Sequence, residues 1–323
     1  MSDEQYALGV DIGASNVRLC IGTREGEILK KVSQSTPKKG TSGKVVTEQI
    51  ISLVKSIQSD FSSSLVGIGI GSIGPLDIQQ GIVHKPPNLP YRKISLKDPL
   101  KKAVNLPVFI LNDCVTAVIG EKHFGAGKER ENLAFVTLSS GIGGGIIVDG
   151  HVLVGKEGNA TEIGHVVVDP EGRLTCGCGK RGHWEAYCGG ENIPNYVELL
   201  IENGRISPRT LLSGKVHERK LSSELIYRLA KAGNKEALKI TEDIGKINAI
   251  GFADLINCFA PSLITVGGAI ALSNPELVLT PIKRYLENYT INPVPSIELT
   301  PLKEDVVLYG ALWMAFNRFP EKT

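Results

Sequence analysis

The sequence predicts an α/β protein with two domains, and three observations support that prediction. Short apolar runs that read as strands alternate with helically periodic segments, a pattern typical of α/β folds with mixed or mostly parallel sheets. The chain has 323 residues, a length that favours two domains over one. Its composition, with 42% hydrophobic residues and 36 glycines, is typical of a globular protein rich in turns.

The first expected elements form a β-hairpin. An apolar run at 6–10 ends in the loop Asp11-Ile-Gly-Ala-Ser-Asn16, and a second apolar run at 17–21 follows at once. Residues 47–61 carry apolar side chains at helical spacing, with Thr47 as the expected N-cap. Further along we expect strands at 65–70, 107–111, 133–138, 145–148 and 262–266, and helices at 116–123, 224–258 and 307–316.

The charge balance and the apolar pattern exclude several classes of protein. The chain has 36 basic and 34 acidic residues, a net charge of +2, and no Lys/Arg block of the kind that binds nucleic acid. Its N-terminus lacks the basic and apolar regions of a signal peptide, and no run approaches the roughly 18 apolar residues of a membrane-spanning helix. We therefore expect a cytoplasmic protein that binds neither nucleic acid nor membranes.

Two segments match phosphate-loop patterns without the context that those patterns need. Gly69-Ile-Gly-Ser-Ile-Gly74 fits the dinucleotide fingerprint, but Pro75 follows where a helix should begin. Residues 150–156 have Walker A spacing, but Glu157 stands where a Ser or Thr should hold Mg²⁺. We interpret the second segment as a hairpin turn and neither one as a phosphate site.

A different pair of loops is more informative. Residues 11–16 and 139–145 each join two apolar strands, so each is a tight turn that exposes backbone N–H groups and small hydroxyls. Such turns bind phosphate oxygens without a helix. Asp11 suits Mg²⁺-bound water, and Asn16 suits a phosphate. Gly and Asp also serve simply to turn a chain, but two such loops, each with Ser next to Gly, favour phosphate binding.

Asn112 and Asp113 close the apolar run at 107–111. Ligands of α/β sheets gather at the carboxyl ends of strands, where a reactive carboxylate is expected. Asp113 is equally suited to cap the helix that follows. The residues alone leave these two interpretations nearly equal.

His165, Cys176, Cys178 and His183 predict a structural zinc site. They place four nitrogen and sulfur ligands within nineteen positions, among glycines that permit tight turns. Cys176 and Cys178 are one residue apart and unsuited to a disulfide, and a reducing compartment favours a metal site over disulfides. Four protein ligands leave no open position, so the ion would not perform the chemistry. Glu162 and Glu185 flank the cluster and suit sugar hydroxyls, although solvated surface charge is the alternative.

Taken together, these residues resemble the ROK family of sugar kinases over nearly the whole chain, and the ordered set of motifs is highly specific. The motifs are Asp-Ile-Gly-Ala-Ser-Asn at 11–16, Pro-Asn-Leu at 87–89, Asn-Asp at 112–113, Gly-Ile-Gly-Gly-Gly at 141–145, Glu-Ile-Gly-His at 162–165, and the Cys-x-Cys-Gly-x-x-Gly segment at 176–182 followed by Trp184-Glu185.

The resemblance implies an actin-like (ribonuclease H-like) ATPase fold of two α/β domains with a cleft between them. We expect an N-terminal domain at 1–112, completed by a C-terminal helix at about 305–323, and a larger domain at 113–304 that contains the zinc segment. The implied activity is that of an ATP:hexose 6-phosphotransferase that uses Mg²⁺ and carries a structural Zn²⁺. The family also suggests a homodimer or homotetramer.

The resemblance implies a role for each matching residue. Asp113 would be the base that takes the proton from the sugar 6-hydroxyl. The implied sugar contacts are Asn88, Asn112, Asp113, Glu162, His165 and Glu185. The implied ATP-binding residues are Asp11, Gly13, Ser15 and Asn16 in the first phosphate loop, Ser140 and Gly141 in the second, and Gly268 and Ala269 beside the adenosine. The implied zinc ligands are His165, Cys176, Cys178 and His183.

Three positions depart from the family pattern. His183 replaces the family's third zinc cysteine, and Cys188 competes with it as the fourth ligand. The usual Gly-Thr-Gly of the second phosphate loop reads Ser-Ser-Gly at 139–141. Thr161 replaces the Gly between Ala160 and Glu162, a change that bears on substrate preference.

Glucose is the favoured substrate, and the alternatives are N-acetylmannosamine and N-acetylglucosamine, because the family uses the same hydroxyl-binding residues for all three. A rival of another class is a sugar-responsive transcription regulator, which carries a helix-turn-helix domain ahead of the kinase-like part. We expect none here, since the first strand begins by Tyr6. A sugar-binding protein without catalysis is disfavoured because Asp11 and Asp113 are both present.

Overall fold

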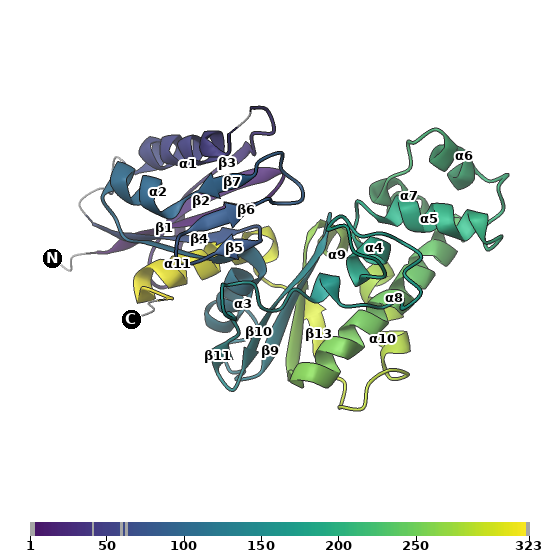
Figure 1. The fold of residues 1–323 in the computed structure, drawn as a ribbon. Coiled ribbons are helices and arrows are strands. Elements are labelled where there is room, and N and C mark those ends of the chain that lie inside the picture. Colours follow the sequence, from purple (N-terminus) through teal and green to yellow (C-terminus); the bar gives the residue numbers. More distant parts are fainter. Residues whose placement is uncertain (1–3, 41, 59–60, 62–63, 321–323) are drawn as a thin grey trace. The chain divides into compact units, whose positions relative to one another are not determined.

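The computed structural model describes residues 4–40, 42–58, 61 and 64–320, and the chain divides into two compact units (Figure 1). The first unit comprises residues 1–131, 145–161 and 304–323, and the second comprises 132–144 and 162–303. Each unit contains strands and helices, so the predicted α/β class is confirmed.

The first unit is built on a five-stranded sheet with the order β3-β2-β1-β4-β8. The strands are β1 (Tyr6–Ile12), β2 (Asn16–Gly22), β3 (Ile28–Ser35), β4 (Leu65–Ser72) and β8 (Val108–Asn112). The first three are antiparallel, as the predicted hairpin requires, whereas β4 and β8 run parallel to β1. The carboxyl ends of β1, β4 and β8 therefore lie at one edge of the sheet.

Helices cover both faces of this sheet (Figure 1). On one face are α1 (Lys44–Ile57) and α2 (Lys97–Val104), and on the other are α3 (Asp113–His123) and α11 (Val306–Asn317). Alternation along β1 supplies both cores. Leu8 and Val10 belong to a large cluster with α1, while Ala7 packs with Leu308 and Leu312 of α11. A small sheet of β5 (Leu76–Asp77), β6 (Ile82–His84) and β7 (Lys93–Ser95) also belongs to this unit.

The predicted cap of the first helix was wrong. The helix α1 begins at Lys44, three residues before the predicted start, and its N-cap is Gly43. Thr47 is buried, and its hydroxyl donates to the Ser95 carbonyl oxygen at 2.8 Å. The helix ends at Ile57; residues 59–60, within the predicted range, lie outside the described residues.

The glycines that mimic a dinucleotide fingerprint have a packing role. Gly69 and Gly71 lie on β4, Gly74 follows it, and the next element is strand β5 and not a helix, so the rejection of that fingerprint is confirmed. A Cβ atom on Gly69 would lie only 1.9 Å from the Ala311 carbonyl oxygen, and one on Gly71 only 2.4 Å from the Val307 side chain. The missing side chains let the backbone of α11 lie directly against the sheet.

The second sheet has the order β11-β10-β9-β12-β13. Its strands are β9 (Leu133–Leu138), β10 (Ile142–Val148), β11 (His151–Val152), β12 (Leu263–Gly267) and β13 (Ser296–Leu299). Strand β12 runs parallel to both β9 and β13. Strand β10 begins three residues before the predicted start at 145. By the ranges of the two units, β11 and residues 145–148 of β10 are counted with the first unit. The second unit contains β9, β12, β13, η1 (Ile163–His165), α4 (Trp184–Cys188), α5 (Ile193–Glu202), α6 (Leu211–His217), α7 (Ser223–Lys231), α8 (Lys235–Phe259), α9 (Ala269–Ser273) and α10 (Pro275–Leu286). The 3₁₀ turn η2 (Lys303–Asp305) precedes α11.

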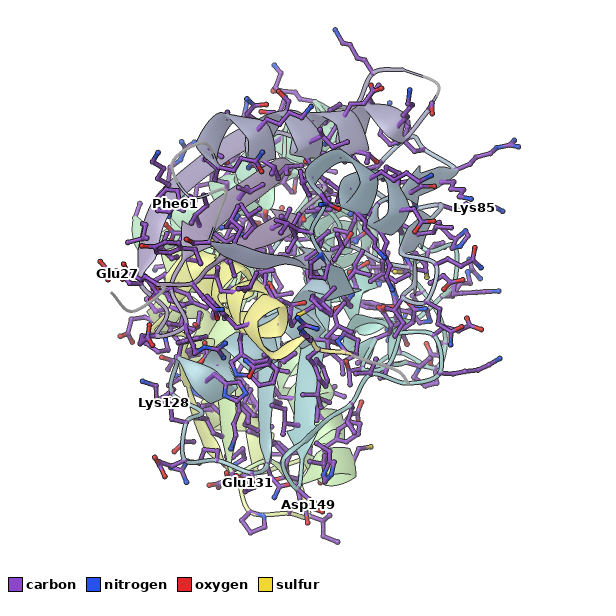
Figure 2. All side chains as sticks on the ribbon, turned by 90° about the vertical axis from the view of Figure 1, so that its left-hand side faces the viewer. Glu27, Phe61, Lys85, Lys128, Glu131 and Asp149 are labelled. Carbon is purple, nitrogen blue, oxygen red and sulfur yellow. The ribbon has the colours of Figure 1, made fainter. Side chains whose placement is uncertain are left out.

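The Walker-like segment is a hairpin turn, as predicted. Val148 pairs with His151 across a turn in which Asp149 and Gly150 both have positive φ, the conformation of the tight turns that suit β-hairpins. The Gly150 N–H donates to the Glu131 carbonyl oxygen at 2.9 Å, and Glu131 and Asp149 are both labelled in Figure 2.

The single helix predicted at 224–258 is two helices. Between α7 and α8, Gly233 has a φ of 81°, a value that favours glycine. The Asn234 side chain then caps α8 by accepting from the N–H groups of Glu236 and Ala237. Gly233 and Asn234 therefore separate two helices that the apolar periodicity alone predicts as one continuous helix.

The described units differ from the predicted ranges 1–112 and 113–304 at residues 113–131 and 145–161, both of which belong to the first unit. Helix α3 lies there because it packs closely on α11. A Cβ atom on Gly120 would lie 2.4 Å from the Val306 carbonyl oxygen, and one on Gly310 would lie 1.8 Å from that of Thr116. Among the described residues, no helix is both long enough and apolar enough to cross a membrane.

The close contact between Gly69 of β4 and α11 predicts that a single added methyl group destabilises the protein strongly. We expect Gly69→Ala to lower the free energy of unfolding by about 3 kcal/mol or more, because the new methyl group meets a backbone carbonyl that cannot turn away. The control is Gly214→Ala in α6, where the added methyl meets no atom within 4 Å and helix propensity gains about 1 kcal/mol. Urea unfolding of both variants tests this; equal midpoints for Gly69→Ala and the parent would contradict it.

A half-buried histidine predicts a pH dependence of stability. His123 stacks on Trp313 at a centroid distance of 4.1 Å, and burial lowers the pKa of His123 to about 4. The unfolded chain takes up this proton near pH 6.5 and the folded chain only near pH 4, so this group removes stability as the pH falls between those values. We expect His123→Phe to keep the stack and flatten that part of the stability profile. An unchanged slope between pH 6.5 and 4 would refute the assignment.

Candidate active site and metal-binding segment

The first predicted phosphate loop joins β1 to β2. The Gly13 N–H donates to the Asn16 carbonyl oxygen at 2.9 Å, which closes a tight turn with Ser15 and Asn16 exposed. Asp11 precedes the turn and is buried, and the Arg18 guanidinium holds its carboxylate through Nε, at 2.9 Å, and NH2. Burial raises the pKa of Asp11, and Arg18 opposes that rise. The carboxylate is thus fixed at the entrance of the loop.

Strand register brings this loop and Asp113 to the same edge. Ile12 of β1 pairs with Ser72 of β4, and Ser72 pairs with Asn112 of β8. The loop begins one residue after Ile12, and Asp113 comes one residue after Asn112. Because neighbouring strands lie about 4.8 Å apart, the two features leave the sheet roughly 10 Å from each other.

The structure separates the two interpretations of Asp113. The N-cap of α3 is Asn112, whose Oδ1 accepts from the N–H groups of Cys114 and Val115 at 2.8 and 3.3 Å. Asp113 is the half-buried first residue of the helix, and its Oδ1 accepts from the Cys114 N–H at 2.8 Å. The capping role belongs to Asn112, so capping does not account for the carboxylate at position 113.

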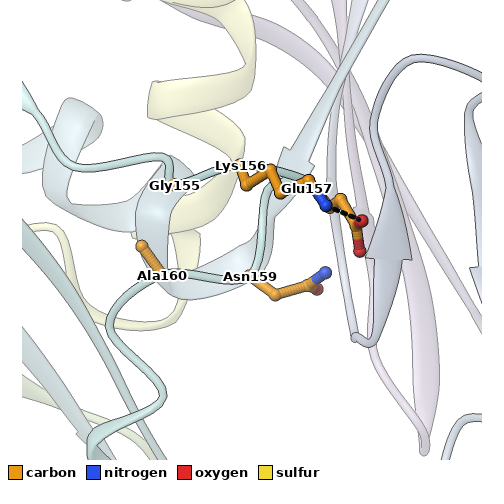
Figure 3. A pocket seen from close by; sticks show the side chains of 5 residues that line it. All are labelled: Gly155, Lys156, Glu157, Asn159 and Ala160. Carbon is orange, nitrogen blue, oxygen red and sulfur yellow. Dashed lines mark ion pairs between the residues drawn. The ribbon is translucent and has the colours of Figure 1, made fainter.

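Asn88 and the loop at 155–160 also belong to the first unit. Asn88 is exposed between β6 and β7. The loop lines a pocket of about 350 Å³ (Figure 3), and Asn159 fixes it by a reciprocal pair of 2.7 Å hydrogen bonds with the backbone of Leu76. Thr161 follows with a φ of 61°, where glycine is favoured. Thr161, which replaces the glycine of the family pattern, therefore has a strained backbone immediately before Glu162.

The second predicted phosphate loop lies beside the predicted adenosine residues in the second unit. Gly267 of β12 pairs with Thr137 of β9, so the residues that follow both strands share one edge. A Cβ atom on Gly268 would lie 2.5 Å from the Leu138 carbonyl oxygen. This places Gly268 and Ala269, at the start of α9, next to the Ser139-Ser140-Gly141 turn.

Glu185 holds the turn at 139–141, the second predicted phosphate loop, by a contact that the sequence did not predict. Its Oε2 accepts from the Ile142 N–H at 2.8 Å, and a Cβ on Gly141 would lie 2.4 Å from the same oxygen. Its Oε1 lies 3.5 Å from the Cys176 sulfur. One carboxylate therefore connects the loop to the predicted metal segment.

The four predicted metal ligands converge. The ligand atoms of His165, Cys176, Cys178 and His183 all lie within 4.8 Å of one another. Burial raises the pKa of the Cys176 thiol to about 12, so a metal ion must displace a proton to bind this sulfur. The arrangement is a candidate metal site formed by the predicted residues.

Cys188 is not part of this cluster. It lies on the buried side of α4, and its thiol donates to the Ile244 carbonyl oxygen at 3.6 Å. Burial raises its pKa well above the ordinary value. Of the two candidates for the fourth ligand, the geometry favours His183.

A buried carboxylate braces the metal segment. Asp169 accepts hydrogen bonds from the backbone and guanidinium of Arg173 and from the Tyr187 hydroxyl. These donors hold the pKa of Asp169 well below its usual value. Tyr187 also accepts from the Leu174 N–H at 3.1 Å. The turn that carries the cysteines is therefore tied to α4 independently of any metal.

The predicted site residues thus fall into one group in each unit. The first unit holds Asp11, Gly13, Ser15, Asn16, Asn88, Asn112 and Asp113. The second holds Ser140, Gly141, Glu162, His165, Cys176, Cys178, His183, Glu185, Gly268 and Ala269. Thr36 is absent from the prediction although it contacts the first loop, because a lone Thr after a strand carries no motif.

Comparisons with known proteins agree over almost the whole chain. The model of the ROK family matches residues 7–318. A glucokinase of Pyrobaculum calidifontis is 34% identical over 312 residues, which cover 96% of this chain and 95% of that protein. The crystal structure of a ROK family glucokinase from Streptomyces griseus, in complex with glucose and AMPPNP, is 30% identical, has a TM-score of 0.80, and covers 97% of this chain and 99% of that one. The xylose repressor of Bacillus subtilis is 30% identical over 84% of this chain and 66% of its own length.

The cluster geometry predicts different consequences for two cysteine-to-alanine substitutions. With Zn²⁺ as the probe, we expect Cys178→Ala to lose bound metal and to lower Tm, because it removes a ligand. We expect Cys188→Ala to keep the metal. Elemental analysis of the dialysed proteins measures both. Metal loss in Cys188→Ala with retention in Cys178→Ala would reverse the ligand assignment.

Proposed function

Because this chain belongs to the ROK family, we propose that it is an ATP-dependent glucokinase that phosphorylates the 6-hydroxyl of glucose. The resemblance and the actin-like fold class inferred from the sequence are confirmed by the family match and by the solved ROK structure. Relatives named glucokinase, of nearly the same length, support the predicted sugar kinase activity.

The observation that carries the proposal is the shared edge of β1, β4 and β8. It brings the tight turn at 13–16 and the Asp113 carboxylate to the same edge of the sheet, about 10 Å apart. Strand ends of this kind are where ligands of α/β sheets bind. A nucleotide phosphate at Gly13 and a sugar hydroxyl at Asp113 fit that separation.

The proposed reaction is an in-line phosphoryl transfer from Mg·ATP. Asp113 accepts the proton of the sugar 6-hydroxyl. At the same time, the oxygen of that hydroxyl forms a bond to the γ-phosphorus of ATP. The bond between the γ-phosphorus and the oxygen that bridges to the β-phosphate breaks, which releases ADP. Because the transition state is loose, positioning and charge neutralisation supply most of the rate. In the proposal, the turn at 13–16 holds phosphate oxygens, and Asp11 faces Mg²⁺-bound water. The turn at 139–141 keeps the phosphate-binding role that the family resemblance implies.

The predicted sugar contacts are retained in the proposal with two refinements. Asn112 uses Oδ1 to cap α3, so Nδ2 is its group for a hydroxyl. Glu185 uses Oε2 to hold the Ile142 N–H, so Oε1 is its group for a hydroxyl. Asn88, Glu162 and His165 keep the roles that the family resemblance implies.

We propose that the metal cluster holds Zn²⁺ in a structural role. The Sγ–Nδ1 distances are 3.7 Å between Cys176 and His165 and 3.3 Å between Cys178 and His183. Tetrahedral zinc with its usual bond lengths needs about 3.6 Å between sulfur and nitrogen ligands, so the residues fit the ion. When bound, zinc would cross-link η1 to the turn at 176–183, beside Glu185.

The alternatives are weaker. N-acetylmannosamine and N-acetylglucosamine remain competing substrates that a panel of sugars must test. The chain spans 66% of the length of the xylose repressor that it matches, and Asp113 at the edge of the sheet supports an enzyme over a regulator. A cytoplasmic location and a homodimer or homotetramer stay predictions.

Removing the proposed base tests the mechanism. We expect Asp113→Asn to bind glucose normally and to lose turnover by roughly 10²- to 10⁴-fold or more, because general-base catalysis supplies about that factor. The control is Asp98→Asn, which removes the same charge from the first turn of α2, where the side chain is exposed. An ADP-release assay and calorimetric glucose titration measure both. Near-normal turnover of Asp113→Asn would rule out its role as the base.

The same assay tests the substrate. We expect the highest kcat/KM for glucose among glucose, mannose, fructose, glucosamine, N-acetylmannosamine and N-acetylglucosamine. A preference for an N-acetylated sugar would replace the glucokinase proposal with the N-acetylhexosamine alternative. No ADP release with any of them would overturn the kinase proposal.

A further inference from the structure

Thr36 makes two hydrogen bonds to the first phosphate loop. It follows the last residue of β3 and is buried, with 4% of its surface exposed. Its Oγ1 donates to the Gly13 carbonyl oxygen at 2.7 Å, and its N–H donates to the Ser15 carbonyl oxygen at 2.9 Å. Two of the carbonyl groups in the turn are therefore held by one residue that lies more than 20 positions away along the chain.

The segment that carries Thr36 is itself fixed on both sides. The Gln49 amide of α1 donates to the Ser35 carbonyl oxygen at 2.9 Å. The buried Tyr91 hydroxyl donates to the Pro37 carbonyl oxygen at 2.8 Å. Thr36 is thus presented to the loop from a rigid position between α1 and the segment that contains Asn88.

These contacts orient two peptide groups of the loop. A peptide unit is planar and trans, so its C=O and its N–H point in opposite directions. When the Gly13 carbonyl points at Thr36, the Ala14 N–H points away from Thr36. The Ser15 carbonyl fixes the Ser15–Asn16 peptide unit, and with it the Asn16 N–H, in the same way. Backbone N–H groups set in advance are what a phosphate-binding turn requires, because they need no rearrangement when the anion arrives.

We infer that Thr36 is a positioning residue for nucleotide binding: it holds the 13–16 turn in its phosphate-binding conformation without touching the nucleotide. The inference rests on the proposed function of that turn and adds a residue that the family motifs do not contain. It predicts an effect on the nucleotide that is separate from any effect on the sugar or on overall stability.

The chain offers a matched control in the same unit. Thr47 is also buried, and its hydroxyl donates to a backbone carbonyl, that of Ser95, at 2.8 Å. Thr36→Val and Thr47→Val therefore remove equivalent hydrogen bonds with the same change of shape. Only the first bond reaches the loop.

The experiment measures ADP affinity by calorimetry without sugar, the KM values for ATP and glucose, and Tm. We expect Thr36→Val to raise the Kd for ADP and the KM for ATP about tenfold, the size of effect expected for one lost hydrogen bond to a buried carbonyl. The KM for glucose should stay within about twofold, since Asn88 and Asp113 lie outside the turn. Thr36→Ser, which keeps the hydroxyl, should restore nucleotide affinity. Thr47→Val should lower Tm to a similar extent and leave ADP affinity unchanged.

Two results would overturn the inference: ADP affinity in Thr36→Val equal to that of the parent, or equal losses in Thr36→Val and Thr47→Val. If Thr36→Val does not fold, Thr36→Ala removes the same hydroxyl, and its ADP affinity is compared with that of the parent and of Thr47→Val. A parent protein that neither binds ADP nor phosphorylates any sugar would instead refute the proposed function, so the two failures are distinct.

Discussion

The first unit depends on a contact between backbones. On β4, Gly69 and Gly71 present no side chain to α11, and the helix lies against the strand at distances that even a methyl group would prevent. Gly120 and Gly310 allow the same closeness between α3 and α11. Dispersion attraction falls off steeply with separation, so such contacts are strong when the surfaces meet and are lost when a single atom intervenes. This packing fixes α3 relative to the sheet and thereby fixes Asp113 at its first residue.

In the second unit, the Glu185 carboxylate connects two segments. Glu185 meets both the turn after β9 and the sulfur of Cys176. The Asp169 brace ties the cysteine turn to α4 before any ion binds. The segment is therefore partly ordered by protein contacts alone, and a metal ion would add to that order.

Much of this arrangement was predictable from the sequence, and the exceptions have physical causes. Motif residues such as Asp11 and His165 were found because their chemistry and spacing are distinctive. Thr47 was assigned to a cap because local rules favour Thr there, but a tertiary bond to Ser95 determines its role. The break at Gly233 was hidden by apolar periodicity that continues across it.

Other contacts carry no local signal at all. Asn112 and Asp113 are equally good caps by residue type, and only the backbone geometry shows which one caps α3. Thr36 and Gly13 are far apart in sequence, and neither residue type predicts the pair. The specific partners of Glu185 likewise depend on how two loops meet in space.

The place of α11 in the chain has a consequence for biosynthesis. The ribosome synthesises a chain from its N-terminus, yet the first unit needs α11 (Val306–Asn317) to cover the glycine face of β4. Domains generally fold as they emerge, N-terminal parts before later ones. Here β1 and β4 must wait for α11, while the second unit is synthesised between them. One face of the sheet thus stays uncovered while more than 200 residues are added, so the nascent chain is at greatest risk of aggregation until α11 appears.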